Sequence, residues 1–83
     1  LFIFDQPGNY GFWMKDMGFA LDILFFNASG TVITIHKDAT PESYREVPPV
    51  VFYPTAPAMY VLEVPAGFTS EKGIVEGMHT ELK

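Results

Sequence analysis

Three charged residues lie within segments of large apolar side chains and are the first candidates for chemistry. Lys15 follows a run of aromatic residues, while Asp22 and Glu63 each interrupt a hydrophobic run. A buried charge without a partner costs several kcal/mol, so such residues are expected to pair with one another or to serve a site. The simplest prediction is a structural ion pair or network in which Lys15 bridges Asp22 or Glu63.

The same side chains would also suit acid–base chemistry. Two carboxylates that flank a glycosidic bond can hydrolyse it, provided that the carboxyl groups lie within about 10 Å of each other. Such an enzyme would need Asp22 and Glu63 in one open cleft, with Lys15 beside them. A hydrolase that acts on a carbohydrate is therefore the alternative to a structural ion pair.

Two aromatic residues are candidates for ligand contact. Trp13 is the only tryptophan, and together with Tyr60 it could form a platform for a carbohydrate or another flat apolar ligand. In the competing interpretation both rings belong to the core or line a barrel, with their polar tips hydrogen-bonded. The full candidate cluster for binding is Trp13, Lys15, Asp22, Tyr60 and Glu63.

Residues for other chemistries are missing or wrongly spaced. The chain has no cysteine, which excludes disulfides and thiolate metal sites. His36 and His79 are not arranged as H-x-x-x-H or a comparable metal motif, and no P-loop, G-x-G-x-x-G or serine nucleophile elbow occurs. We therefore expect no metal and no cofactor.

Composition predicts one small, acidic domain that spans residues 1–83. Hydrophobic residues make up 48% of the 83-residue chain and aromatic residues 16%, which is enough for a single dense core. The net charge is -5, with 10 acidic and 5 basic residues and no basic cluster. Nucleic acid and anionic membrane surfaces are therefore not expected as partners. No apolar run approaches the roughly 20 residues of a membrane-spanning helix, so membrane insertion is not expected.

Alternating and β-branched segments predict an all-β fold. We expect strands at residues 1–4, 12–17, 21–27, 31–37, 50–53, 58–64 and 79–82. Turns are expected at residues 5–9 and 27–30, a long loop at 38–49, and a short helix over 71–74 capped by Thr69 or Ser70. The spacing indicates a small barrel or jelly-roll-like sandwich of about six or seven short strands, with one short helix near the C-terminus.

Two strands have predictable positions in the sheet. Residues 21–27 are largely apolar on both faces, so this strand should be central and covered on both sides. Residues 50–53 are followed by Pro54 and Pro57, which confine a strand to an edge because proline cannot donate to the hydrogen-bond ladder.

Several motifs together resemble a known family. Residues 12–15 (F-W-M-K), followed by 21–23 (L-D-I), resemble the F-W-M-K-N-T-x-x-P-L-D-I-x-F signature of the DUF192 (UPF0127) family. Residues 30–32, 60–67 (Y-V-L-E-V-P-A-G) and 73–77 are similar to its later motifs, in the same order. The resemblance implies a small β-rich prokaryotic domain of unknown function. It also implies that the N-terminal strand of the family domain and its G-L-M-x-R-type segment are absent here.

The resemblance leaves the compartment open. Many bacterial relatives are exported or periplasmic, but residues 1–4 are too short for a signal peptide. The chain also departs from the family pattern: Asp16-Met17 replaces Asn-Thr, Ala20 replaces Pro, and Met78 replaces Asp. The added charge of Asp16 beside Lys15 favours a local structural pairing.

Three hypotheses for function follow. The first is a non-enzymatic module that binds a small molecule or carbohydrate, or a partner, through the candidate cluster. The second is the hydrolase that uses Asp22 and Glu63. The third is a structural or oligomerisation domain, in which residues 1–4 pair either with a segment missing from this chain or with a second copy in a homo-oligomer.

Overall fold

The computed structural model describes residues 1–80, which are built around one antiparallel β-sheet. Its strands are β1 (Phe2–Gly8), β2 (Leu21–Phe26), β3 (Val32–Ala39) and β4 (Ala58–Pro65), in the spatial order β1-β4-β2-β3. A 3-10 helix, η1 (Pro41–Arg45), follows β3, and an α-helix, α1 (Phe68–Lys72), follows β4. The prediction of a mainly β domain with one short helix near the C-terminus is confirmed.

The architecture is simpler than predicted. The sheet of the described residues has four strands rather than six or seven, and β1 and β3 are its two edges. Because these edges do not pair with each other, the sheet is open and does not form the expected barrel or jelly roll.

Strand β2 lies in the middle of the sheet, as predicted from its sequence. All six of its residues are buried, and β3 and β4 flank it through antiparallel pairing. Its side chains alternate between two core clusters, one around Ile23 and Phe25 and the other around Leu24 and Phe26. We refer to these two sides of the sheet as the first face and the second face.

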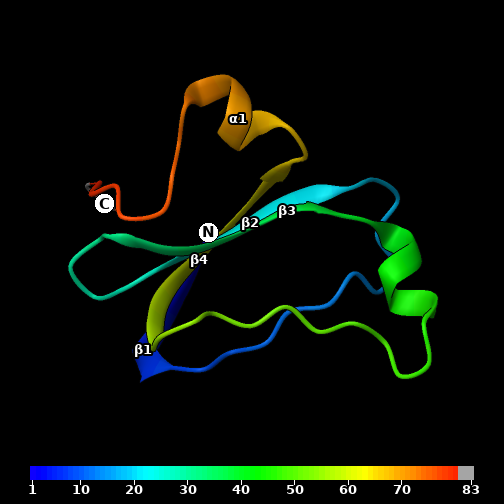
Figure 1. Cartoon of the computed structure of the whole chain (residues 1–83). Coiled ribbons are helices and arrows are strands. Elements are labelled where there is room, and N and C mark those ends of the chain that lie inside the picture. The colour runs from blue at the N-terminus through cyan, green and yellow to red at the C-terminus, as the bar shows by residue number, and fades with distance from the viewer. Residues whose placement is uncertain (81–83) are drawn as a thin grey trace.

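Each face has its own cover (Figure 1). Residues 9–20 and 41–57, which include η1, lie over the first face and contribute several aromatic side chains to its cluster. We call these segments the aromatic cover. Residues 68–80, which comprise α1 and the segment after it, lie over the second face, where Ile74 packs against the smaller cluster. We call this segment the strap.

Two predicted strands, residues 12–17 and 50–53, are reduced to one isolated bridge. Phe12 and Phe52 exchange backbone hydrogen bonds with N···O distances of 3.0 and 2.7 Å. Extended backbone ends soon after Phe12, in a turn where Asp16 has a φ of 59°. This left-handed conformation is tolerated better by Asp than by most residues. Asp16 therefore fits a turn at a position where a longer strand was expected.

The hairpin predicted at residues 27–30 is confirmed between β2 and β3. The side-chain oxygen of Asn27 accepts hydrogen bonds from the N–H groups of Ser29 and Thr31, at 3.1 and 3.0 Å. Gly30 has a φ of 89°, a conformation that glycine adopts without steric cost. The turn chemistry read from the sequence is thus the chemistry that closes the hairpin.

Other element boundaries differ from the prediction. Strand β1 continues through the turn expected at residues 5–9, although its pairing with β4 is irregular there. The loop expected at residues 38–49 contains η1. Of the strand expected at residues 79–82, His79 forms a bridge with Thr31, and residues 81–82 lie outside the described residues.

The helix α1 begins earlier than predicted because Thr69 does not cap it. Its N-cap is Gly67, with a φ of 92°, and no side chain caps it. Thr69 lies inside the helix, fully buried, and its hydroxyl group donates to Asp22 instead. No helix within residues 1–80 is long and apolar enough to span a membrane.

Candidate functional site

The carboxylate of Asp22 is buried on the second face, and hydrogen-bond donors from two elements surround it. One oxygen accepts from the Asp38 N–H at 3.0 Å, and the other accepts from the N–H and the hydroxyl of Thr69 at 3.1 and 2.7 Å. Asp38, with a φ of 55°, lies where the register between β2 and β3 shifts. Asp22 therefore fastens the irregular end of β3 and the start of α1 to the central strand.

These donors keep the carboxylate charged. Burial alone would raise the pKa of Asp22, but the hydrogen bonds from Asp38, Thr69 and Gly67 outweigh burial, and the pKa lies below its ordinary value. A carboxylate with these partners is a poor general acid, because it holds its charge and has little free capacity to accept a proton. Asp22 thus acts as a structural anchor.

A hollow of about 330 Å³ lies beside this anchor. It is lined by Asp22, Lys37, Asp38, Ala66, Gly67 and Ser70. Lys37 Nζ donates a hydrogen bond of 3.1 Å to Ser70 Oγ across it. Because both oxygens of Asp22 already accept hydrogen bonds from the protein, the hollow offers a ligand little beyond exposed side chains.

Glu63 lies on the other side of the sheet from Asp22. Asp22 is paired with Val64, and Glu63 is paired with Ile23. Paired residues point to the same face and successive residues to opposite faces. Glu63 therefore belongs to the first face, and the two carboxylates do not share a cleft. Burial raises the pKa of Glu63 above its ordinary value.

Lys15 neutralises neither carboxylate. Its side chain is exposed, and it lies in the turn that follows the bridge residue Phe12. Within residues 1–80 the salt bridge that forms joins Arg45 to Glu42, at 3.6 Å on the surface. The predicted ion pair of Lys15 with Asp22 or Glu63 is therefore wrong, because hydrogen bonds rather than an ammonium group satisfy the buried charge.

Trp13 and Tyr60 are also separated. Tyr60 is paired with Phe26 on β2 and packs against the cluster of the second face. Trp13 belongs to the aromatic cover of the first face, and its side chain is 49% exposed. The five residues proposed from the sequence therefore do not form one site, and Tyr60 is half-buried against the cluster of the second face.

Trp13 has other aromatic neighbours in the aromatic cover. Because Phe12 and Phe52 form a bridge, residues 11–13 and 51–53 run alongside each other. Phe12 and Phe52 pack toward the core, so by alternation their neighbours Trp13 and Tyr53 point outward. Each of these two side chains is 49% exposed. Diagonal neighbours of this kind lie about 7 Å apart.

Gly11 explains how the Tyr53 ring lies on this ribbon. A Cβ atom at Gly11 would be 2.6 Å from Cε1 of Tyr53 and 2.6 Å from a methyl carbon of Val51. Only glycine leaves room for the ring at this position. We call the outward rings of Trp13 and Tyr53, together with the partly buried Tyr44 that contacts Trp13, the aromatic platform.

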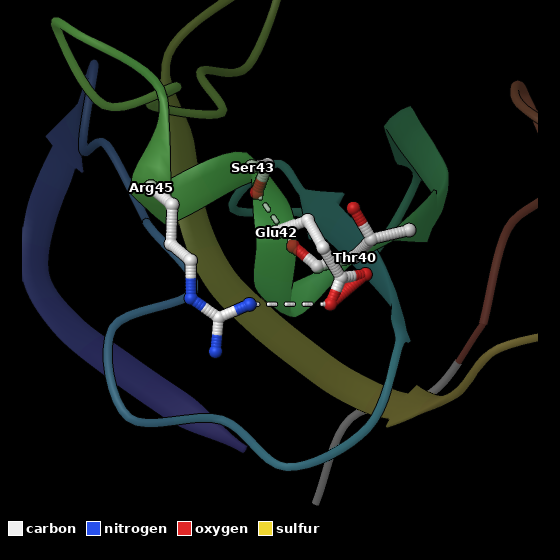
Figure 2. Close-up of polar contacts among 4 residues, drawn as sticks. All are labelled: Thr40, Glu42, Ser43 and Arg45. Atoms are coloured by element: carbon white, nitrogen blue, oxygen red, sulfur yellow. Dashed lines mark hydrogen bonds and ion pairs between the residues drawn. The ribbon is translucent and has the colours of Figure 1, made fainter.

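Tyr44 holds Trp13 from the side. The two rings meet edge to face, with centroids 5.1 Å apart and planes at 84°. Tyr44 is positioned by η1, where the hydroxyl of Ser43 donates to the carbonyl of Thr40 at 2.7 Å (Figure 2). Ser43 also accepts a backbone hydrogen bond from Val50, at 3.1 Å, which ties η1 to the next segment.

An exposed ion pair lies on η1, close to Tyr44 in the chain. Figure 2 shows Glu42 and Arg45 pointing toward each other, and their side chains are 70% and 74% exposed. An exposed ion pair of this kind contributes little to stability. Its donors and acceptors are therefore free to exchange partners with a ligand.

The sequence pointed to Trp13 but missed Tyr44 and Tyr53. Both lie in segments rich in proline and in acidic residues that favour a solvated loop. The available signal was the matching alternation of Gly11-Phe12-Trp13 and Val51-Phe52-Tyr53, in which each central Phe is flanked by one small or aliphatic residue and one large aromatic residue.

Comparisons with known proteins agree with this fold. A protein from Sinorhizobium meliloti 1021, described as a candidate transcription regulator, has a solved structure with 34% identity and a TM-score of 0.81, matching 92% of this chain and 55% of that one. A protein of unknown function from Novosphingobium aromaticivorans DSM 12444 has 27% identity and a TM-score of 0.84, matching 98% of this chain and 54% of that one. The chain thus spans about half the length of these two proteins.

No curated protein matches the chain. The family model of DUF192, described as an uncharacterised ACR, matches residues 1–82. Nearly the whole sequence is covered by this match, as the motifs in the F-W-M-K and L-D-I segments indicated. The chain belongs to the DUF192 family.

Proposed function

We propose that this domain is a non-enzymatic binding module and that the aromatic platform is its binding surface. The observation that carries the proposal is the pair of half-exposed rings, Trp13 and Tyr53, held outward on adjacent backbone segments. Three features hold these rings in place: the Phe12–Phe52 bridge, the edge-to-face contact of Tyr44, and the absence of a side chain at Gly11. A preformed surface loses little conformational entropy on binding.

The ligand class that fits best is a neutral carbohydrate. The C–H face of a pyranose ring packs on an exposed aromatic ring, while its hydroxyl groups need donors and acceptors at the rim. We propose that Glu42 and Arg45, which are neighbours of Tyr44 on η1, supply both. An aromatic platform with a charged rim therefore suits a sugar better than a wholly apolar ligand.

Trp13 provides a direct test, since it is the only tryptophan. Cellobiose and maltose should be titrated while the emission of Trp13 is followed. We expect a saturable change with a dissociation constant of about 1 mM, a free energy of binding near 4 kcal/mol in magnitude. No change in Trp13 emission at concentrations well above this value would contradict the proposal.

Variants sharpen the test. Tyr53→Ala should weaken binding about tenfold, because it removes half of the stacking surface. Tyr60→Phe is the matched control, since Tyr60 lies on the second face, and it should leave binding unchanged. Equal loss in both variants would show that binding does not occur at the aromatic platform.

The hydrolase hypothesis has less support. Asp22 and Glu63 point to opposite faces, and Asp22 is occupied by hydrogen bonds from Asp38 and Thr69. The acidic residue Glu42 is close to Tyr44 in the chain, but its carboxylate lies in an exposed ion pair with Arg45. We therefore propose binding of a carbohydrate rather than its cleavage.

Self-association is a second candidate, and it rests on one observation. Strand β1 is an edge strand of the described sheet, and Leu1, Phe2 and Ile3 are 55%, 45% and 67% exposed. Apolar edge strands readily pair with another chain. We propose a second copy as the partner. Light scattering should give a dimer, and Ile3→Lys should give a monomer; a monomeric unmodified chain would contradict this candidate.

Nucleic acid is not among the proposed partners. One structural neighbour is described as a candidate transcription regulator, and the chain covers 55% of it. The present chain has a net charge of -5, whereas binding to a phosphate backbone depends on clustered Lys and Arg residues. We expect any role in regulation to act through ligand binding rather than through direct contact with DNA.

A further inference from the structure

The second face contains an apolar pocket of about 140 Å³, separate from the aromatic platform. Its floor is formed by Leu24 and Phe26 of β2 and by Leu62 of β4, and Ile74 and Met78 of the strap form its outer wall. The floor residues of β2 are buried, at 1% and 3% exposed, while Met78 is 39% exposed. The pocket therefore lies between the sheet and the strap, with its outer side reachable from solvent.

Backbone hydrogen bonds to β3 hold the strap over this pocket, in addition to the packing of Ile74 against the sheet. Val32 of β3 donates to the Met78 carbonyl at 2.8 Å and accepts from the Gly77 N–H at 2.7 Å. Farther along, the Thr80 N–H donates to the Gly30 carbonyl at 2.9 Å. These bonds fix the distance between the strap and the edge of β3 whether or not the space beneath is filled.

Two further contacts keep the strap from closing onto the sheet. The carboxylate of Glu76 accepts a hydrogen bond of 2.9 Å from the Ile35 N–H, which anchors the strap on the side of the pocket toward α1. On the other side the backbones already touch, since a Cβ at Gly30 would lie 2.3 Å from the Thr80 carbonyl oxygen. The strap is thus held at both ends, and the pocket is preformed.

We propose that this pocket binds a small uncharged apolar group, of the size of one aromatic ring or a short alkyl chain. Apolar cavities of about 150 Å³ lined by Leu, Ile and Phe side chains accept benzene. The present pocket has a similar volume and is lined by Leu, Ile and Phe side chains together with Val32, Met78 and Thr80. Thr80 supplies the only polar side chain among the lining residues. A charged group would therefore lose its hydration without gaining a partner.

The position of the pocket at the edge of the strap favours an apolar occupant. The lining is largely apolar and the outer side is reachable from solvent, so an apolar group that enters removes apolar surface from water. It gains contacts with the lining without moving the strap. The platform on the first face does not contribute to this site, so the proposal is independent of carbohydrate binding.

Benzene is the probe for an aromatic ring and 1-butanol the probe for a short chain. Each should be titrated into the full chain while the methyl resonances of Leu24, Leu62, Val32 and Ile74 are followed by NMR. We expect saturable shifts confined to these methyl groups for at least one probe. The absence of saturable shifts for both probes, or shifts spread evenly over the protein, would overturn the proposal.

Two variants of matched chemistry locate the site. Leu62→Phe fills the pocket and should weaken binding of the probe about tenfold. Val75→Phe introduces the same side chain at an exposed position of the strap that does not line the pocket, and it should leave binding unchanged. Equal binding to both variants would overturn the assignment.

Met78→Ala provides a second test of the pocket if the Leu62→Phe variant does not fold. Met78 is partly exposed at the outer wall, so its truncation should preserve the fold while enlarging the pocket. We expect this variant to bind indole, a larger ring, at least about fivefold more tightly than the unmodified chain does. Unchanged affinity for indole would count against a site beneath the strap.

Discussion

Asp22 and Glu63 lie one residue apart on the same pair of strands, yet their surroundings are opposite in kind. Asp22 is almost fully buried on the second face and accepts three hydrogen bonds from β3 and α1. Glu63 is half-buried on the first face, where burial raises its pKa. The difference shows that burial alone does not decide the role of a carboxylate in this sheet. The donors that other elements bring to it decide that role.

The covers of the two faces differ in the same way. The aromatic cover holds the first face through stacked and edge-to-face rings, as where Phe12 meets Phe25 with centroids 5.9 Å apart. The strap holds the second face through Asp22 and through backbone hydrogen bonds, and it leaves an apolar pocket beneath it. One cover therefore depends on side-chain packing and the other on a few polar anchors.

Removal of the polar anchor should have the largest effect. Asp22→Ala leaves the N–H groups of Asp38 and Thr69 without an acceptor, and each such loss of a charged partner costs about 1.5–3 kcal/mol. We expect the free energy of unfolding to fall by about 3–5 kcal/mol, measured by urea denaturation. Ser70→Ala, at an exposed neighbour of Thr69, is the control and should change little. Similar losses in both variants would mean that Asp22 is not the anchor.

Truncation of the aromatic cover should cost less, since Phe12 is only partly buried. Its ring contacts Phe2, Phe4 and Phe25, with centroid distances of 5.2, 6.3 and 5.9 Å. Phe12→Ala should therefore lower the free energy of unfolding by about 2–3 kcal/mol, somewhat below the range for fully buried Phe. Ile74→Ala in the strap should cost less again, because the pocket already reduces its contacts. If Ile74→Ala costs more than Phe12→Ala, the contrast between the two covers fails.

The two carboxylates should give pH dependences of opposite sign. The pKa of Asp22 is lowered in the folded state, so its contribution to stability is present above the unfolded value of about 3.9 and is lost as pH falls through the folded value. The pKa of Glu63 is raised, so its contribution is greatest below about pH 4.3 and declines as pH rises through the folded value.

Unfolding midpoints between pH 3 and pH 7 would separate these two contributions. Asp22→Asn should remove the loss of stability at acidic pH, although the variant is less stable at neutral pH. Glu63→Gln should become slightly more stable than the unmodified chain at neutral pH, because no charge is then buried. If Asp22→Asn loses stability at acidic pH as the unmodified chain does, another group is responsible for that loss.

The central strand and the hairpin could be predicted because their signals are local. β2 is apolar on both faces, and the residues around Asn27 are those that a tight turn requires. The limits of the strand at Phe12 could not be predicted in this way, because they depend on a turn at Asp16 and on pairing with Phe52, forty residues away in the chain. Such long-range pairing has no local signature in the sequence. The same holds for the absence of pairing between β1 and β3, which leaves the sheet open.

The candidate site shows the same division between local and long-range information. Charged and aromatic residues could be singled out from composition, but the side of the sheet on which each lies depends on strand register. In the pairing of β2 with β4, Asp22 and Glu63 are offset by one residue, and this offset places them on opposite faces. Thr69 could be recognised as a cap-forming residue, yet it bonds to Asp22 because the strap returns to β2. Trp13 was found from sequence, whereas its neighbours Tyr44 and Tyr53 depend on the fold.

Substitution of Lys15 should have the smallest effect on stability. It also distinguishes most clearly between an ion pair and hydrogen bonds as the interactions that stabilise the buried carboxylate. An ammonium group that neutralised Asp22 or Glu63 would make Lys15→Met strongly destabilising. In the structure Lys15 is exposed, and Asp22 is satisfied by Asp38 and Thr69. We therefore expect Lys15→Met to leave the urea midpoint within experimental error at pH 7, like most surface substitutions. A large fall in the midpoint would show that Lys15 interacts with a buried carboxylate. Hydrogen bonds would then not be the only interactions that stabilise the charge of Asp22.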